Sequence, residues 1–277
     1  MVKAAVLTVH GQGRTLPGYA NTFIRRIKGR LPPRDWQHVH FEQAYYQRSL
    51  DRNQTTYYEA VRKKIQSHTL RQAFLFGFSD AASLQTNKRG TEAPYYLAQF
   101  ELRAALRKCY RELTREGPLG PDARVIVVAN SLGAQVMSNY FWDANQLRAR
   151  GQNPKYGIWK DDEEPFTDDP VEDAFCRGAH VHTFYTTGCS IPIFVAGQDP
   201  DSIFAFDRLN DAFRWINIFD DDDALGWPLR PLSPSYAALV EDRELRLGHT
   251  ILTHMSYWSH RKVVGEVART VGTLIKS

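Results

Sequence analysis

Residues 124–140 read RVIVVANSLGAQVMSNY, and two periodicities meet inside this stretch. The apolar run at residues 125–129 is rich in β-branched side chains, which predicts a short strand buried on both faces. From residue 134 to residue 141 the apolar side chains recur at the spacing of a helix. Ser131 therefore lies where a buried strand turns sharply into a helix.

A nucleophile elbow requires this context, in which a catalytic serine occupies a tight strand-to-helix turn. Neighbouring backbone comes close there, so the positions two before and two after the serine must be small. Here they are Ala129 and Gly133. The backbone N–H of Leu132, at the start of the helix, is free to bind a developing oxyanion. The alternative is a serine in an ordinary loop that caps the helix.

Length and composition are those of one large α/β domain. The chain has 277 residues, of which 43% are hydrophobic and 12% aromatic, enough for a sizeable core. The formal charge is only +4, so we expect no nucleic-acid partner. The basic cluster at residues 25–34 is interpreted as a solvated helix face.

Cysteine usage and hydropathy predict the compartment. The three cysteines, Cys109, Cys176 and Cys189, have no paired spacing, which indicates a reducing environment. The first apolar run is too short for a signal peptide, and no run approaches the ~20 apolar residues of a membrane span. We expect a cytoplasmic protein without stable membrane insertion. Cys189 follows an expected strand, where a packed small residue is a simpler interpretation than a reactive thiol.

A glycine-rich turn follows the first expected strand, residues 4–9. Its sequence, His10-Gly11-Gln12-Gly13, is neither G-x-G-x-x-G nor a P-loop. Glycines allow close backbone approach, so the Gln12 amide is a candidate second oxyanion donor. His10 is either a buried structural histidine or a residue of the pocket.

Residues 73–78 (AFLFGF) are expected to form a strand, which makes Ser79 a rival elbow serine. The segment that follows is polar and lacks helical periodicity, so Ser131 is the better candidate. Asp80 is expected at the mouth of the pocket.

Further expected strands cover residues 36–45, 181–185 and 215–219, and expected helices cover residues 19–28, 57–70, 95–116 and 261–275. Residues 151–177 are acidic and contain prolines, which predicts a mobile surface excursion or lid. The spacing of a calcium loop is absent from them. His38 and His40 alternate on an expected strand, but without a cysteine or carboxylate pattern we expect no metal site.

The late part of the chain holds candidate partners for the serine. A serine nucleophile needs an adjacent base, and a carboxylate orients a histidine in that role. Four aspartates, residues 220–223, follow the last clear strand. Three histidines come before or at the final helix: His249 in an expected surface turn, His260 at the helix start, and His254 between them. Position favours His254 as the base.

The glycine-rich turn, the serine, the aspartates and the histidine follow one another in this order along the chain, and with that order the sequence resembles the α/β-hydrolase superfamily. The resemblance is carried by VLTVHGQG, VIVVANSLGAQV, INIFDDDDALGWPL and THMSYW, and looks closest to uncharacterised serine-hydrolase members of the esterase and lipase kind. It implies that Ser131 is the nucleophile, His254 the base and an aspartate the orienting residue. Asp223 matches the family pattern best, because an aliphatic residue follows two positions later, ahead of a proline. Asp220 is second.

Two positions depart from the family pattern. Ala129 replaces the usual glycine, and Asn130 stands where many members carry histidine. Neither change removes a member of the implied triad.

We therefore predict one α/β-hydrolase-like domain over residues 1–277, a three-layer fold with a mainly parallel sheet and helices on both faces. The predicted function is hydrolysis of a small-molecule ester or thioester through an acyl-serine, with Gln12 and Leu132 as oxyanion donors and no metal or organic cofactor. The alternatives are a non-catalytic binding or scaffold protein with the same fold, and an acyltransferase.

Overall fold

The computed structural model describes residues 1–47, 50–86, 88–146, 151, 154–160, 167–248 and 251–276. The strands are β1 (Ala4–Val9), β2 (Val39–Ala44), β3 (Arg124–Asn130), β4 (Val181–Thr187), β5 (Arg214–Phe219) and β6 (Val240–Glu244). The helices are α1 (Asn21–Lys28), α2 (Asp51–Val61), α3 (His68–Thr86), α4 (Pro94–Leu113), α5 (Leu132–Phe141), α7 (Pro170–Cys176), α8 (Ile191–Val195), α9 (Pro234–Leu239) and α10 (Arg261–Leu274).

The six strands form one sheet in the order β2-β1-β3-β4-β5-β6, and every neighbouring pair is parallel. Successive side chains of the central strands enter different cores: in β1, Leu7 and Val9 face one core, and Ala4 and Val6 face the other. A sheet covered on both faces explains why these strands are continuous apolar runs. The predicted three-layer α/β fold with a parallel sheet is confirmed.

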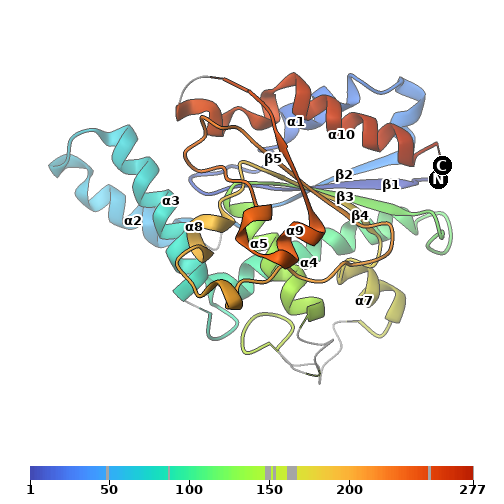
Figure 1. Cartoon of the computed structure of the whole chain (residues 1–277), viewed down its shortest axis with the longest axis horizontal. Helices are drawn as coiled ribbons and strands as arrows, with labels where there is room; N and C mark the ends of the chain where they lie inside the picture. Colours follow the sequence, from blue (N-terminus) through green and yellow to red (C-terminus); the bar gives the residue numbers. More distant parts are fainter. Residues whose placement is uncertain are drawn as a thin grey trace.

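Helices cover the two faces in separate layers, as Figure 1 shows. Helices α1 and α10 pack together over one face, where Phe23, Val264 and Val267 are buried. Helices α4 and α5 lie on the opposite face, where Leu102 and Met137 are buried. The α2–α3 hairpin projects from the end of the sheet that faces away from the two chain termini (Figure 1).

The strand order reverses between β1 and β3. From β1 the chain goes outward to β2, then crosses to the other side of β1 and continues through β3 to β6. In open parallel sheets of this kind, ligands bind outside the carboxyl ends of the strands at the reversal. Strand β1 ends at Val9 and β3 at Asn130. The glycine-rich turn and Ser131 therefore both begin at this place.

Residues 73–78 lie within helix α3, so the strand predicted for them is wrong. A short apolar run does not by itself distinguish a strand from a buried helix. The buried residues Phe76, Asp80 and Leu84 follow one another at helical spacing. Of the polar residues assigned to a loop, Ser83, Gln85 and Thr86 belong to this helix, whereas Lys88, Arg89 and Gly90 follow it. Ser79 lies in the middle of the helix.

Strand β6 was not predicted from the sequence. Its residues, VEDRE, are mostly charged, and it pairs only with β5 at the edge of the sheet. Charged side chains are typical of edge strands, which must avoid pairing with other chains. The helix expected at residues 57–70 is divided, because α2 ends at Val61 and α3 begins at His68. The strand expected at residues 36–45 starts later, after the 3-10 helix Pro33–His38.

The excursion expected over residues 151–177 is shorter than predicted, because Pro170–Cys176 forms helix α7, which packs against α4. Trp159 and Phe175 are buried in the core on this face. Residues 161–166 lie outside the described residues, so the lid stays a prediction. Over the described part of the chain, we find no helix with the length and apolar character that a bilayer span requires.

Candidate active site

Ser131 occupies the turn between β3 and α5 with φ 53° and ψ −124°. Positive φ is uncommon for a residue with a side chain, and such strain, on the order of 1–3 kcal/mol, concentrates at functional sites. Close packing imposes the turn, since a Cβ added at Gly133 would lie 2.2 Å from the carbonyl oxygen of His10. The N–H of Ser131 donates to the carbonyl of Thr187 at 2.9 Å. This is the strand–turn–helix geometry of a nucleophile elbow.

His254 lies beside the serine hydroxyl. It belongs to the 3-10 turn Ile251–Met255 beyond β6, and its Nε2 lies 2.8 Å from Ser131 Oγ. Its Nδ1 faces a carboxylate and therefore carries the proton, which leaves Nε2 to accept the serine O–H. Ser131 is 1% exposed and His254 8% exposed. The hydrogen bond between them is shielded from bulk water.

Asp223, in the loop after β5, completes a chain of hydrogen bonds. His254 Nδ1 donates to its Oδ2 at 2.9 Å, the N–H of Leu225 donates to Oδ1 at 3.0 Å, and the hydroxyl of Tyr257 donates to Oδ2 at 2.8 Å. Burial disfavours the charged carboxylate, but hydrogen bonds from His254, Leu225 and Tyr257 and the attraction of His254 outweigh it. The pKa of Asp223 is therefore below its usual value.

Two glycines make room for this carboxylate. A Cβ at Gly226 would lie 2.3 Å from Asp223 Oδ2 and 2.8 Å from the Cα of Gly188. Gly188 itself has φ 55°, a conformation that glycine adopts without strain. The sequence around Asp223 is thus matched to close packing against the end of β4.

Asp220, the second candidate for the orienting role, has a different position. Its Oδ1 accepts the N–H of Asp222 at 2.9 Å, and its Oδ2 accepts the N–H of Leu247. Its own N–H donates to the hydroxyl of Tyr257 at 3.1 Å. Asp220 joins the end of β5 to the segment after β6, and the carboxylate bonded to His254 is that of Asp223.

The glycine-rich turn lies against the elbow. A Cβ at Gly11 would come within 2.9 Å of Ser131 Cβ, so only glycine leaves this approach open. The N–H of Gly13 donates to Asp80 Oδ2 at 2.8 Å, which ties the turn to α3. Asp80 is 0% exposed, so it supports the turn from inside and does not line the pocket mouth as predicted.

Two backbone amides next to this contact have no partner within the described structure: Leu132 follows Ser131, and Gln12 follows Gly11. Among the residues described, we find no hydrogen bond from the N–H of Gln12 or of Leu132. Leu132 begins α5, where the first N–H groups of a helix lack internal acceptors. Neither N–H is therefore used by another group within the described structure.

His10 is a structural residue rather than part of the pocket. Its Nδ1 donates to the carbonyl of Gly11 at 2.8 Å, and its Nε2 accepts the N–H of Tyr46 at 3.2 Å. The ring stacks on that of Tyr46 with centroids 4.0 Å apart. Burial, partly offset by the bond to Gly11, lowers the pKa of His10 to about 4, so the ring is neutral near neutral pH.

The remaining candidates that the structure describes have other contacts. His260 caps α10, as expected, by accepting the N–H of Lys262, and His249 lies outside the described residues. Burial raises the pKa of Cys189 to about 12, which disfavours a reactive thiolate. His38 Nδ1 is 3.0 Å from the carbonyl of Met1, and His40 is 3.4 Å from Glu42.

Sequence reasoning missed two supporting residues. The hydroxyl of Tyr257 joins Asp223 to the backbone of Asp220. Gln54, on α2, donates to Asp80 at 2.6 Å and thereby supports the glycine-rich turn. The proximity of Tyr257 to His254 in HMSYW was a signal for the first, whereas no local pattern marks the second.

Comparison with known proteins gives distant structural neighbours. No family model and no curated protein matches the chain. An inhibited esterase B from Lactobacillus rhamnosis is 11% identical with a TM-score of 0.48, covering 99% of this chain and 78% of the esterase. An acetyl xylan esterase is 12% identical with a TM-score of 0.41, covering 100% and 98%. The RedJ thioesterase of Streptomyces coelicolor is 9% identical with a TM-score of 0.37, covering 99% and 86%. Because these sequence identities and TM-scores are low, we base the fold on the strand order and the function on the geometry of the site.

Proposed function

We propose that this protein is a serine hydrolase that cleaves a carboxylic ester or thioester of a small molecule. The observation that carries the proposal is the hydrogen bond of 2.8 Å between Ser131 Oγ and His254 Nε2, with Asp223 at 2.9 Å on the other ring nitrogen. A serine hydroxyl becomes a nucleophile when a base accepts its proton, and a carboxylate fixes the tautomer and stabilises the imidazolium. The strained turn at Ser131 supports the same conclusion.

In the proposed mechanism, Ser131 Oγ attacks the carbonyl carbon while its proton passes to His254 Nε2. The imidazolium then gives that proton to the leaving alcohol or thiol, and an acyl-serine remains. Water attacks the acyl-serine, with His254 accepting its proton and returning it to Ser131 as the acid is released. Asp223 remains charged throughout, consistent with its lowered pKa.

We assign the oxyanion to the amides of Leu132 and Gln12. Leu132 follows Ser131, Gln12 follows the Gly11 that packs against Ser131, and in the described structure we find no acceptor for either N–H. Donors fixed before the reaction stabilise the tetrahedral intermediate without reorganisation, typically by about 3–4 kcal/mol for each donor. The bond from Gly13 to Asp80 holds the turn that carries Gln12.

The chemistry is tested with p-nitrophenyl esters of graded chain length and a fluorophosphonate probe. We expect labelling of the native protein, and none of Ser131→Ala, with kcat lower in that variant by about 10³-fold or more. The control is Ser79→Ala, which makes the same serine-to-alanine change on α3 and should leave activity at the native level. Because Ser131 is 1% exposed, we expect acetyl or butyryl esters to react faster than long-chain esters.

Two outcomes would redirect the proposal. Absence of labelling in the native protein would favour a non-catalytic binding protein, and preferential transfer to an added alcohol over water would favour an acyltransferase. Reducing, cytoplasmic surroundings remain part of the proposal, supported by the three buried free cysteines.

A further inference from the structure

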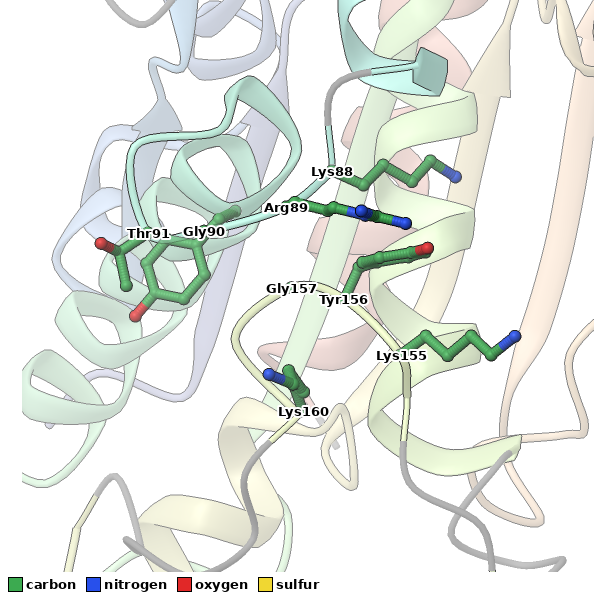
Figure 2. Close-up of a pocket in the computed structure, with 9 residues that line it drawn as sticks. Lys88, Arg89, Gly90, Thr91, Lys155, Tyr156, Gly157 and Lys160 are labelled. Atoms are coloured by element: carbon green, nitrogen blue, oxygen red, sulfur yellow. The ribbon is translucent and has the colours of Figure 1, made fainter.

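A basic cavity lies outside the catalytic arrangement. It has a volume of about 420 Å³ and is lined by Lys88, Arg89, Gly90, Thr91, Tyr96, Lys155, Tyr156, Gly157 and Lys160. Two segments far apart in the sequence form its walls: the connection from α3 to α4 and the turn at residues 155–160 (Figure 2). Neither Ser131, Asp223 nor His254 belongs to the lining.

The lining is strongly positive. Among the residues that the structure describes, it contains four basic side chains and no acidic one. Within the described ranges we find no ion pair that involves Lys88, Arg89, Lys155 or Lys160. Figure 2 shows Lys88, Arg89 and Lys155 extending to the same side, with Tyr156 between them. Like charges gathered in a concave site raise the local potential and attract anions.

The walls are fixed by buried contacts rather than left as loose surface chain. Gln99 on α4 accepts the N–H of Ile158 at 3.0 Å through its Oε1. Gly157 packs so tightly on that side chain that a Cβ would lie 2.0 Å from Gln99 Oε1. The next residue but one, Trp159, is 3% exposed, and the guanidinium of Arg177 lies 4.3 Å from its ring centroid. The turn that carries Lys155 and Lys160 is therefore held in place.

Lys88 is held on the opposite wall. Its Nζ lies 4.6 Å from the ring centroid of Tyr95, whose hydroxyl donates to the buried Asp143 at 2.6 Å. Burial lowers the pKa of Lys88, and the charges of Asp143 and Tyr156 only partly oppose this. An anion in the cavity would replace solvation that the ammonium group has lost.

We propose that this cavity binds the phosphate group of a small-molecule ligand. A phosphate offers several charged acceptor oxygens, which match lysine ammonium groups and the forked donors of an arginine. Tyrosine and threonine hydroxyls in the lining add neutral donors. A concave site of about 420 Å³ suits a compact ligand better than an extended polymer.

The ligand has two candidate sources. A narrow crevice of about 10 Å³ is lined by both Tyr95, whose ring lies beside Lys88, and Leu132, the residue after Ser131. The phosphate is either the charged end of the hydrolase substrate or part of a separate ligand. Only the first source rests on the proposed hydrolase function.

Binding is tested by calorimetric titration of the full-length protein with pyrophosphate at constant ionic strength. We expect saturable binding, weakened about tenfold or more in the double variant Lys155→Gln/Lys160→Gln. The matched control is Lys63→Gln/Lys64→Gln, which removes the same charge from exposed positions on the 3-10 helix Arg62–Lys64. Its affinity should change less than twofold. Absence of binding to the native protein, or equal weakening in the two double variants, would overturn the proposal.

A second arm distinguishes the sources. If the phosphate belongs to the substrate, Lys155→Gln/Lys160→Gln should lower kcat/KM about tenfold for a phosphate-bearing ester and leave a neutral ester unchanged. If kcat/KM changes equally for both esters while pyrophosphate binding is lost, the phosphate belongs to a separate ligand. That result still supports a phosphate-binding cavity. Ser131→Ala should bind pyrophosphate as tightly as the native protein. Failure of the hydrolase assay therefore leaves the binding result intact.

Discussion

Ser131 combines backbone strain with burial, and both have consequences for its chemistry. Its φ of 53° turns the chain away from the sheet, so the hydroxyl faces His254 rather than a backbone acceptor. Burial excludes water from the hydrogen bond between Ser131 and His254, and it strengthens the electrostatic interactions among Ser131, His254 and Asp223. The serine is thus held in position before any substrate binds.

The carboxylate that orients the base can be identified by comparing two aspartates in the same loop. Asp223→Asn should lower kcat by about 10³- to 10⁴-fold, because an amide no longer fixes the required imidazole tautomer. Asp220→Asn should retain most of the activity and lose stability, because the bond to the N–H of Leu247 weakens. Steady-state kinetics and thermal unfolding of both variants measure this, and the reverse pattern would assign the role to Asp220.

Tyr257 is expected to act through Asp223. Tyr257→Phe removes the donor at 2.8 Å from Oδ2, so the pKa of the carboxyl should rise and its hold on His254 should weaken. We expect kcat to fall roughly tenfold, with little change in KM, which corresponds to about 1.4 kcal/mol. Tyr185→Phe is the matched control, because it removes a tyrosine hydroxyl bonded to Thr270 at 2.7 Å on α10. Equal losses in the two variants would point to a general packing effect.

Helix α3 is linked to the glycine-rich turn at the candidate active site through one side chain. Asp80 accepts the N–H of Gly13, and Gln12 precedes that glycine. Asp80→Ala should release the turn and lower kcat about tenfold while the elbow itself is unchanged. Ser79→Ala, at the neighbouring position on the helix, is the control. Native kcat in Asp80→Ala would remove the turn from oxyanion binding.

Helix α7 provides a test of the lid prediction. It packs against α4, and Phe175 and Cys176 are 1% and 0% exposed. We expect its backbone amides to be protected in hydrogen exchange to nearly the same degree as those of α4. Rapid exchange throughout α7 would show instead that the predicted mobile excursion extends to Cys176.

The elements that could be predicted from sequence are those whose pattern is local. Strands β1 and β3 are short apolar runs buried on both faces, and each leads into a turn that contains glycine, so their pattern lies within a few consecutive residues. Helix α3 could not be recognised, because the apolar residues of AFLFGF show no helical spacing among themselves. The helical spacing appears only when the buried residues Asp80 and Leu84, further along the chain, are included. Strand β6 could not be recognised because it is an edge strand with charged, partly exposed side chains, so it lacks an apolar run.

At the scale of the whole molecule, the order of the strands assembles the site. Ser131 follows β3, Asp223 follows β5 and His254 follows β6, and these strands point the same way in one sheet. Parallel strands bring their carboxyl ends to one edge, so residues 123 positions apart meet at 2.8 Å. The sequence could predict the three residues, whereas the support from Tyr257 and Gln54 depends on packing between distant segments.

The pH dependence of the whole fold should report on His10. Its pKa is about 4 in the folded protein and 6.5 in the unfolded chain, so between these values the unfolded chain binds more protons. Stability is therefore complete above about pH 6.5 and is lost as the pH falls toward about 4. The two pKa values differ by about 2.5, and at about 1.4 kcal/mol for each pKa unit the full loss is about 3.5 kcal/mol.

Urea unfolding at pH 7 and pH 5 measures this loss. Protonation would place an N–H of His10 against the N–H of Tyr46, so the ring resists the charge. His10→Gln keeps a donor and an acceptor without titrating. Its free energy of unfolding should fall about 2 kcal/mol less than that of the native protein between the two pH values. His38→Gln controls for removing a histidine from a partly exposed site. An identical pH dependence in the native protein and in His10→Gln would contradict a buried neutral ring, and with it the account of how the turn beside Ser131 is held.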